Sequence, residues 1–308
     1  MKIKDYLDKD EIRFFTRRSN LLAWRTVAVT WATIFAIFAV VDTWTNPITI
    51  LVAVILLAGR QLGLAVIVHE CGHHTLFSNE SLNRLVGQWL CGYVSLQDMY
   101  KYAAGHSYHH QLAGTREDPD LPNYQAYPVT ADSFRRKVIR DLTGQTGSKL
   151  LMFVLRRATE VFSSDPEVRR KALPFAHQVL VAGLFATLLG VLFQPWFYLL
   201  WLAAFLSPYM LIVRIRQVAE HAAVPDLYAA DPRLNTRTTI PTWWERACFA
   251  PNYVNYHLEH HFMASVPCYR LRELHHLLTA RGAYQDTHIF HGYGEVLRHT
   301  IQPTPTNA

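Results

Sequence analysis

Four long apolar stretches constrain this chain more than any other feature of its sequence. They cover residues 21–41, 48–68, 173–193 and 196–213. Each is close to the roughly 20 residues that a helix needs to cross about 30 Å of hydrocarbon. Only short turns separate the first stretch from the second and the third from the fourth. The sequence therefore predicts an all-α integral membrane protein with four transmembrane helices in two hairpins.

Basic residues flank these stretches on one side only. The turns at 42–47 and 194–195 contain no Lys or Arg, whereas the segments before the first stretch, before the third and after the fourth are basic. The positive-inside rule then places 1–20, 97–171 and 222–308 in the cytoplasm. We predict a single domain in the cell (inner) membrane, multi-pass, with both termini cytoplasmic and the two long segments forming a helical cap.

Composition excludes several classes of protein. Half of the 308 residues are apolar and 18% are charged, against roughly a quarter in soluble domains, which excludes a disordered chain. The formal net charge of +6 comes from basic residues beside apolar runs, which indicates a membrane surface and no nucleic-acid partner. Four separated cysteines, without a CxxC pair, indicate no disulfide framework and no structural zinc site.

Arg60 departs from this pattern, because it lies about 18 Å into the second stretch at 1.5 Å per residue. An arginine inside a membrane span is a candidate functional residue. The alternatives are a shifted span or a partner on another helix.

Histidines mark where the chemistry lies. Of 16 histidines, ten fall in four short motifs, which read His69-Glu-Cys-Gly-His73-His74, His106-Ser-Tyr-His109-His110, Glu220-His221 and His257-Leu-Glu-His260-His261. Residues at i, i+3 and i+4 share one face of a helix, so one motif can direct two or three imidazoles to one point. Neutral imidazole binds iron, zinc and copper well. Several converging motifs would fill two coordination spheres at the cytoplasmic face.

Two interpretations from other classes of protein remain open at this point. His69-Glu70-Cys71-Gly72-His73 matches HExxH, which predicts an intramembrane zinc protease with Glu70 as general base. That chemistry needs one further ligand and leaves seven clustered histidines unused. A metal transporter would need ionisable residues along the spans, where only Arg60 and His177 stand out.

The order H-x3-HH, HxxHH, Glu-His, HxxHH between paired hairpins resembles the membrane fatty acid desaturase and hydroxylase superfamily. The resemblance covers roughly residues 21–278. The stretch Asn255-Tyr-His-Leu-Glu-His-His-Phe, followed by Pro267 and Leu271, is especially similar to the last box of that family. The compact length is similar to bacterial members related to the rhizobitoxine-type desaturases, some of which act on small amino-acid-like molecules.

The resemblance implies a cap that holds two iron ions, with O2 as co-substrate. The metal ligands it implies are His69, His73, His106, His109, His110, His221, His257, His260 and His261, with His74 either among them or behind them. Gln217 is a candidate to hold a water ligand. Candidates to hydrogen-bond the outer imidazole nitrogens are Glu70, Glu220, Asn255, Glu259, Asp98, Asp118 and Asp120, for which surface or capping roles are the alternative.

The implied reaction introduces a double bond into a fatty acyl chain or related lipid. Oxygen insertion by a hydroxylase or ketolase, and desaturation of a small molecule, remain alternatives, because these outcomes differ in substrate placement and not in ligand types. For an acyl substrate we expect a narrow apolar tunnel in the cap. Its candidate linings, which could instead be interface anchors, are Tyr93, Met99, Tyr100, Trp243, Trp244 and Tyr256.

The electrons must come from another protein. The sequence contains no haem, iron–sulfur or dinucleotide-binding signature. The resemblance therefore implies an external donor, which is a ferredoxin, a rubredoxin or cytochrome b5 with its reductase. Basic residues that could receive an acidic carrier, or bind anionic headgroups, are Arg135, Arg136, Lys137, Arg156 and Arg157.

Overall fold

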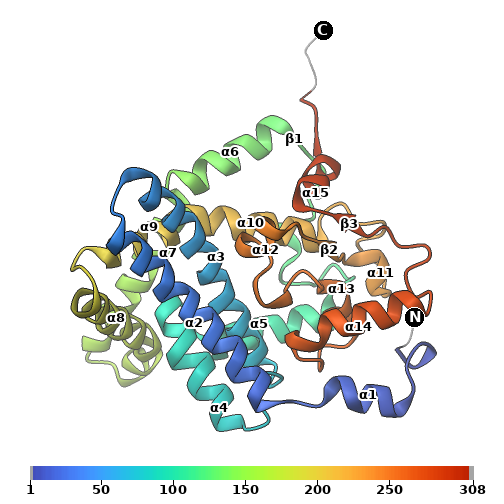
Figure 1. The fold of residues 1–308 in the computed structure, drawn as a ribbon, viewed down its shortest axis with the longest axis horizontal. Helices are drawn as coiled ribbons and strands as arrows, with labels where there is room; N and C mark the ends of the chain where they lie inside the picture. The colour runs from blue at the N-terminus through green and yellow to red at the C-terminus, as the bar shows by residue number, and fades with distance from the viewer. Residues whose placement is uncertain (1–2, 305–308) are drawn as a thin grey trace.

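The computed structural model describes residues 3–304, so the first two residues of the predicted segment 1–20 and the end of 222–308 lie outside the described residues. The prediction of a mostly helical protein with four membrane-length apolar helices is confirmed (Figure 1). The only strands within the described range form two short parallel pairs, β1 (Val129–Thr130) with β4 (Ile301–Gln302) and β2 (Thr239–Ile240) with β3 (Phe290–His291).

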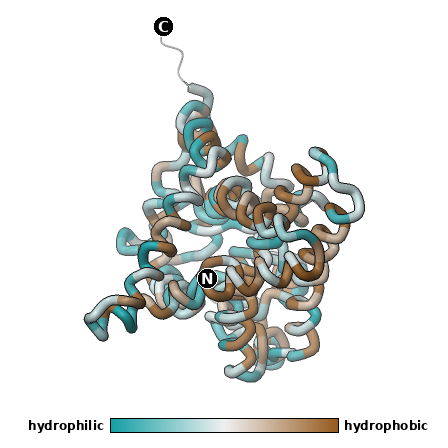
Figure 2. The backbone as a smooth tube through the Cα atoms, turned by 90° about the vertical axis from the view of Figure 1, so that its left-hand side faces the viewer, coloured by the Kyte–Doolittle hydropathy of each residue, from teal (hydrophilic) through white to brown (hydrophobic). Residues whose placement is uncertain are grey.

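Four helical segments are long and apolar enough to cross a membrane. They are α2 (Asn20–Thr43), α3 (Pro47–Gly72), α8 (Pro166–Leu192) and the pair α9–α10, which together cover Phe197–His221. Figure 2 shows long hydrophobic runs in the body of the molecule and a mostly hydrophilic chain near the C-terminus. α3 is the most buried of the four and packs against α2, α9, α10, α12, α5 and η2, so it forms the centre of the fold.

The short connection between α2 and α3 follows from local capping. The Asn46 side chain accepts hydrogen bonds from the backbone N–H groups of Ile48 and Thr49, and the Asn46 backbone N–H donates one to the Thr49 hydroxyl. Pro47, at the first helical position, lacks an N–H that would have no partner there. The chain therefore reverses within residues 44–46.

α2 and α8 begin before their predicted spans, at Asn20 and Pro166, and two other helices continue past the predicted ends toward the histidines. α3 continues from the predicted end at 68 to Gly72, and α10 (Pro208–His221) continues from 213 to His221. Each extension is one to two turns and carries histidines into the neighbouring helical region. The apolar stretches predicted the spans but not these polar ends. The apolar residues stop several positions before the last helical hydrogen bond, so hydropathy alone places the helix end too early.

The stretch 196–213, predicted as one span, is interrupted. α9 (Phe197–Leu206) ends before Ser207, whose φ of −121° and ψ of −89° are not helical, and α10 begins at Pro208. Proline lacks the N–H for a helical bond and its ring clashes with the preceding turn, which explains the break.

The remaining elements are shorter and pack around these helices. They are η1 (Ile3–Asp5), α1 (Lys9–Thr16), α4 (Glu80–Arg84), η2 (Leu85–Gly92), η3 (Tyr93–Ser95), α5 (Met99–Leu112), η4 (Leu121–Asn123), α6 (Ala131–Leu142), α7 (Gln145–Thr159), η5 (Glu160–Phe162), α11 (Pro232–Asn235), α12 (Trp243–Cys248), η6 (Pro251–Tyr253), α13 (His257–Phe262), α14 (Cys268–Ala280) and α15 (Tyr293–Thr300). The π-helix η2 packs closely on α3 at Gly87, where a Cβ atom would lie 2.5 Å from Cys71 Cβ. This packing places the start of α5 beside the end of α3.

Candidate metal centre

Nine imidazoles gather where α3, α5, α10 and α13 meet. One set, the five-histidine group, consists of His69, His73, His106, His110 and His260, and the other, the four-histidine group, consists of His109, His221, His257 and His261. Within each group the candidate ligand atoms all lie within 4.8 Å of one another. Residues more than 190 positions apart in the sequence thus meet in one place.

Each HxxHH motif divides between the two groups. On α5, His106 and His110 face the five-histidine group, whereas His109 faces the four-histidine group. On α13 the division is reversed. His257 and His261 join the four-histidine group, and His260 joins the five-histidine group. Positions i and i+4 differ by about 40° around a helix and i+3 lies about 60° to the other side, so one motif can serve two neighbouring sites.

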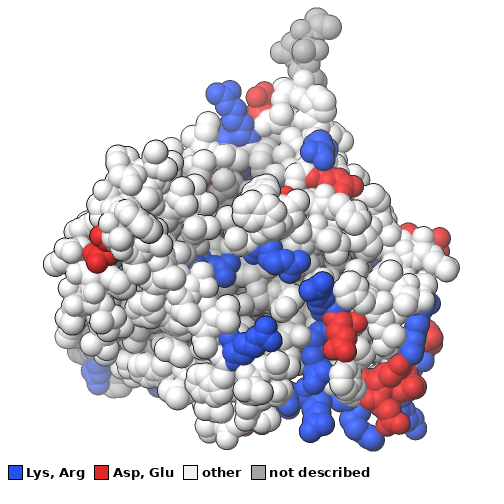
Figure 3. Space-filling view, in the orientation of Figure 1, with Lys and Arg blue, Asp and Glu red and all other residues white. Residues whose placement is uncertain are grey.

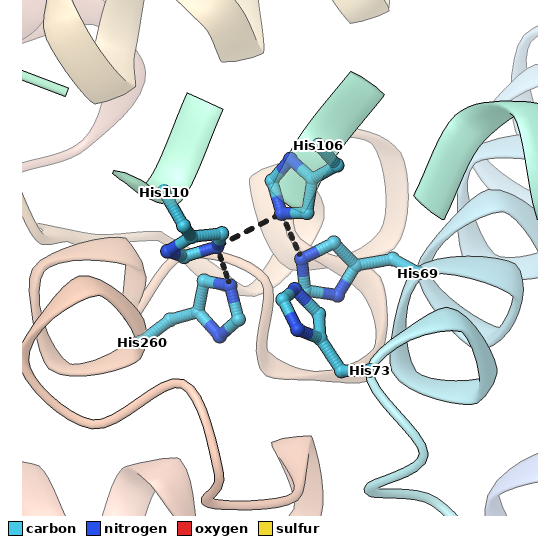
Figure 4. Close-up of side chains that lie close together, drawn as sticks. All are labelled: His69, His73, His106, His110 and His260. Carbon is cyan, nitrogen blue, oxygen red and sulfur yellow. Dashed lines mark hydrogen bonds between the residues drawn. The ribbon is translucent and has the colours of Figure 1, made fainter. Parts of the chain in front are cut away.

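The imidazoles turn their Nε2 atoms toward one another. In the five-histidine group His106 Nε2 lies 2.8 Å from His69 Nε2 and 3.0 Å from His110 Nε2, which lies 2.8 Å from His260 Nε2 (Figure 4). His73 Nε2 is buried and has no hydrogen-bond partner among residues 3–304.

The four-histidine group has the same inward arrangement. His221 Nε2 and His257 Nε2 are 2.8 Å apart, and His109 Nε2 and His261 Nε2 are 3.3 Å apart. A neutral imidazole offers one lone pair, so nitrogens that converge in this way form a ligand set for a cation.

The protonation state also fits a metal. Burial, followed by neighbouring imidazoles, lowers the pKa of His73 to about 2 and that of His110 to about 3. The same causes hold the pKa well below its usual value in His106, His257, His260 and His261. These side chains are therefore neutral near pH 7, which is the form that binds a transition metal. With the unpartnered His73 Nε2, this donor set fits iron or a similar ion.

Three of the predicted carboxylates lie against outer imidazole nitrogens, and Glu70 is the first of them. Glu70 Oε1 is 3.1 Å from His69 Nδ1, and Glu70 Oε2 accepts hydrogen bonds from Thr75 Oγ1 (2.9 Å) and the Cys268 backbone N–H (2.8 Å). The Glu70 carboxylate is thus fully engaged and buried.

The second is Glu220. Its Oε1 lies 3.5 Å from His257 Nδ1 and accepts a hydrogen bond from Arg216 Nη1 at 2.7 Å. The charged guanidinium keeps a buried carboxylate beside an imidazole of the four-histidine group.

Asp118 and Asp120 both lie near His109, although Asp118 makes the closer contact. Asp118 Oδ1 is 2.9 Å from His109 Nδ1, whereas Asp120 Oδ2 is 3.8 Å away. The Tyr124 hydroxyl donates to the other oxygen of Asp118. His221 Nδ1 donates to the backbone carbonyl of Asn235 at 3.0 Å.

Sequence reasoning missed Tyr124 and Asn235. Tyr124 also stacks on His221, with ring centroids 4.8 Å apart. Tyr124 follows Asp118 by six residues, so the acidic segment after the second motif was the available signal. A backbone carbonyl carries no signal in the sequence.

Three predicted neighbours do not contact the nine imidazoles. Glu259 bonds Thr238 Oγ1 and His275 Nδ1, each at 2.5 Å. Asn255 Nδ2 donates to the Thr239 carbonyl at 3.1 Å. Asp98 caps α5 through the backbone N–H groups of its first turn.

His74 lies outside both groups. It follows the end of α3 with a φ of 57°, in the left-handed region, and its side chain is exposed. This turn of the backbone directs it to a surface hollow beside Arg18 and Ser78.

A cavity of about 150 Å³ lies between the two groups. Gln217 and Tyr102 line it, with Val66, Val254 and Leu271 as its apolar wall. Tyr102 stacks on His106, with ring centroids 5.3 Å apart.

None of the predicted tunnel residues lines that cavity, within the described structure. They are dispersed: Met99 is buried against η2, Tyr256 packs against His275, and Trp243 is 85% exposed. The prediction relied on aromatic residues near the motifs, and sequence proximity did not place them at the cavity.

An apolar cleft of about 960 Å³ lies between α5, α7 and α8. Its walls are mainly Leu96, Leu150, Phe153, Val154 and Phe175. Among the described residues, Tyr102 is the lining residue that the apolar cleft shares with the cavity between the histidine groups.

The rim of this cleft is basic but contains paired charges. Lys101 Nζ lies 3.9 Å from the Phe175 ring centroid, and Arg157 pairs with Glu160. Arg170 and Lys171 both pair with Glu167, at 2.9 and 3.3 Å.

Comparison with known proteins agrees with this geometry. Residues 45–293 match the family described as fatty acid desaturase. A dihydrorhizobitoxine desaturase from Bradyrhizobium elkanii is 27% identical over 76% of this chain and 67% of its own length. An sn-1 oleoyl-lipid 12-desaturase from a Synechocystis strain is 27% identical over 69% of this chain and 63% of its own length, and one from a Picosynechococcus strain is 23% identical over 89% and 81%. The match thus spans about two thirds of the first two relatives.

Proposed function

Because the chain belongs to the fatty acid desaturase family, we propose that it is a membrane-bound, O2-dependent di-iron desaturase that introduces a double bond into a fatty acyl chain. The prediction of an oxidoreductase of the desaturase type is confirmed by the family and by the named relatives. The observation that carries the proposal is the pair of converging histidine groups, together with an apolar cleft that shares the lining residue Tyr102 with the cavity between them.

The five-histidine group would hold one iron and the four-histidine group the other. Bound iron supplies the oxidising power from O2 that no side chain has. The chain's own residues orient the imidazoles, because Glu70, Asp118, Glu220 and the Asn235 carbonyl each face an Nδ1 atom and so favour the tautomer with Nε2 free.

Gln217 is proposed to hold a water ligand at the four-histidine group. It lies one helical turn before His221 and lines the cavity between the groups. This group has one imidazole fewer than the five-histidine group, so a water held by the Gln217 amide could supply the missing ligand. Glu259 and Asn255, which contact other residues, are not assigned a role at the iron ions.

The cleft between α5, α7 and α8 supports an acyl substrate. Its apolar walls suit a hydrocarbon chain, and its basic rim lies at the start of α8, where the third span begins. Tyr102 lines both spaces and stacks on His106, so it is the side chain that would position or admit the acyl chain. A small amino-acid-like substrate, which the resemblance to the rhizobitoxine-type desaturases implies, is the second candidate, and the Bradyrhizobium relative is named for dihydrorhizobitoxine.

The proposed topology follows the charge pattern. The four membrane-length helices form two hairpins, and the histidine groups lie in a cytoplasmic cap at the inner membrane. An external ferredoxin, rubredoxin or cytochrome b5 would supply electrons. Arg135 and Arg136 on α6 are exposed and available to an acidic carrier.

The protease alternative is not favoured. The general base of an HExxH site needs a carboxylate that is free to take a proton from water. Glu70 instead accepts hydrogen bonds from Thr75 and Cys268, and His69 and His73 belong to a larger histidine group.

The test is mass spectrometry of total lipids from cells that express the chain or its His257→Ala variant, with a ferredoxin system supplied. We expect an acyl species lighter by two hydrogens that depends on His257. A species heavier by one oxygen would indicate a hydroxylase instead. The experiment is repeated with rubredoxin and with cytochrome b5 and its reductase in place of ferredoxin. If no acyl species changes with any of these three donors, the fatty acyl substrate is wrong.

A further inference from the structure

A second groove, separate from the histidine groups, lies between α2, α3, α12 and α14. Its volume is about 750 Å³. Figure 3 looks onto this face and shows basic side chains gathered in the hollow at its centre. The groove shares no lining residue with the cavity between the histidine groups, so it belongs to neither metal site.

Four arginines line one end of the groove, and each comes from a different helix. They are Arg25 on α2, Arg60 on α3, Arg246 on α12 and Arg272 on α14. No Asp or Glu lines the groove within residues 3–304, and none of the four arginines forms an ion pair there. The basic rim of the apolar cleft differs, because its arginines are paired with glutamates.

Arg60 connects α3 to α12 at this groove. Its Nη2 donates a hydrogen bond of 2.5 Å to the Ala247 carbonyl at the end of α12. One residue earlier, Gly59 lets α12 approach closely, because a Cβ atom there would lie 2.5 Å from the same carbonyl oxygen. The partner on another helix, one of the alternatives for this residue, is thus a neutral carbonyl, and the positive charge of Arg60 remains uncompensated.

The other end of the groove is apolar. Along α2, Arg25 is followed by Val29, Thr33 and Ile37 on the same stripe, and Leu56 of α3 lies on the same side of Arg60, toward the turn at 44–46. The groove thus changes from cationic beside α12 and α14 to apolar along two membrane-length helices. Trp243 and Trp244, at 85% and 48% exposure, lie beside the cationic end, as aromatic residues do at a membrane interface.

We propose that this groove binds one anionic glycerophospholipid. The phosphate would lie among the four guanidinium groups, which suit phosphate oxygens by charge and by their N–H geometry. One acyl chain would lie along Val29, Thr33 and Ile37. The occupant is a lipid and not a free anion, because only a lipid uses both the cationic and the apolar end.

The bound lipid would also brace the last histidine motif. Asn252, in the segment that lines the groove, donates to the Gly63 carbonyl at 2.9 Å, and His257 follows five residues later. A phosphate shared by Arg25, Arg60 and Arg246 would link α2 and α3 to α12. This binding goes beyond the desaturase proposal, since it involves no histidine of either group.

The experiment measures lipid retention by the full chain in detergent, by native mass spectrometry, and its melting temperature. The probes are phosphatidylglycerol, phosphatidylcholine with the same acyl chains, and inorganic phosphate. We expect one phosphatidylglycerol per chain, retained about tenfold more than phosphatidylcholine, with a raised melting temperature. The Arg25→Gln/Arg246→Gln double variant should lose this preference, whereas the Arg135→Gln/Arg136→Gln control on α6 should keep it.

Each other outcome decides against the proposal. Equal retention of both lipids, or equal behaviour of the double variant and the control, would overturn the arginine site. Equal stabilisation by inorganic phosphate would indicate a site for the anion alone. The melting temperature without added lipid reports whether the double variant is folded, and if it is not, the exposed Arg272→Gln variant replaces it with the same expectation.

Discussion

The two histidine groups lie side by side but are supported differently. In the four-histidine group, Nδ1 of His109, His221 and His257 faces Asp118, the Asn235 carbonyl and Glu220, respectively. In the five-histidine group, only His69 has such a contact among the described residues, with Glu70. His260 Nδ1 is buried and has no hydrogen-bond partner among the described residues. The smaller group is therefore held by polar contacts, whereas the larger one depends on helix packing and on its own imidazoles.

This difference suggests how each group would respond to change. A site with more imidazoles can lose one and still have four ligands, but its rings are less fixed in orientation. A site with fewer imidazoles has fixed rings and no ligand to spare. Outer-shell partners commonly change metal affinity by about 10–100-fold, so both kinds of support matter.

The largest effect should come from removing one imidazole from each group. We expect His261→Ala to lose about half of the bound iron and to lower desaturation more than about 100-fold, because three imidazoles remain. His73→Ala should keep most of its iron, because four imidazoles remain in its group. The iron content per chain and the rate of product formation are measured for both variants. Equal iron loss in the two variants would contradict the contrast between the groups.

A smaller effect should follow from changing one outer carboxylate of each group. Asp118→Asn weakens the acceptor for His109 Nδ1, and Glu70→Gln does the same for His69. We expect Asp118→Asn to lower iron affinity about 10–100-fold, since the fixed rings of the four-histidine group depend on such contacts. Glu70→Gln should have the weaker effect on iron affinity.

Competition with a chelator measures the two affinities. Glu70 also binds Thr75 and the Cys268 backbone, so its variant needs a melting-temperature control. A stronger affinity loss in a folded Glu70→Gln protein would reverse the comparison.

The next prediction concerns pH and the metal-free protein. The pKa of His73 is lowered to about 2 and that of His110 to about 3, so the folded state keeps them neutral where the unfolded chain binds protons. Their contribution to stability is therefore fully present above the unfolded pKa of about 6.5 and is lost as pH falls toward the folded values. We expect a lower melting temperature at about pH 5.5 than at about pH 7.5.

The matched test is the His73→Gln variant, measured without metal. Removing one neutral, buried imidazole should make the melting temperature less dependent on pH. An equal melting temperature of the metal-free protein at both pH values would contradict the prediction that folding keeps His73 and His110 neutral at a cost that grows in acid.

Local spacing explains which parts of the site could be predicted. The i, i+3 and i+4 positions of an HxxHH motif lie on one side of a helix, so the spacing predicted that these histidines face one region. It did not predict which of the two groups each histidine joins. Glu259 lies two residues after His257 on α13, about 200° around the helix, and this rotation directs it to His275 and Thr238. Its place between the histidines in the sequence was misleading for that reason.

Long-range contacts could not be predicted. The hydrogen bond from Arg60 to Ala247 joins residues 187 positions apart, and that from Cys268 to Glu70 joins residues 198 positions apart. The break at Pro208 was visible in the sequence, but the apolar run around it favoured one continuous span. Hydropathy predicted the membrane helices. The contacts between distant segments depend on tertiary packing, which no local pattern in the sequence indicates.

The smallest effect should belong to His74, the tenth histidine of the motifs. It is next to His73 in the sequence, but a φ of 57° directs its exposed side chain away from both groups. We expect His74→Ala to keep the iron content and to change desaturation by no more than about twofold, as surface substitutions do. The Ala variant also has to adopt the left-handed backbone at this position, so a His74→Asn variant, which tolerates it better, is the control. Loss of iron in both variants would mean that the end of α3 rearranges when metal binds, and the five-histidine group would then gain a ligand that its present geometry excludes.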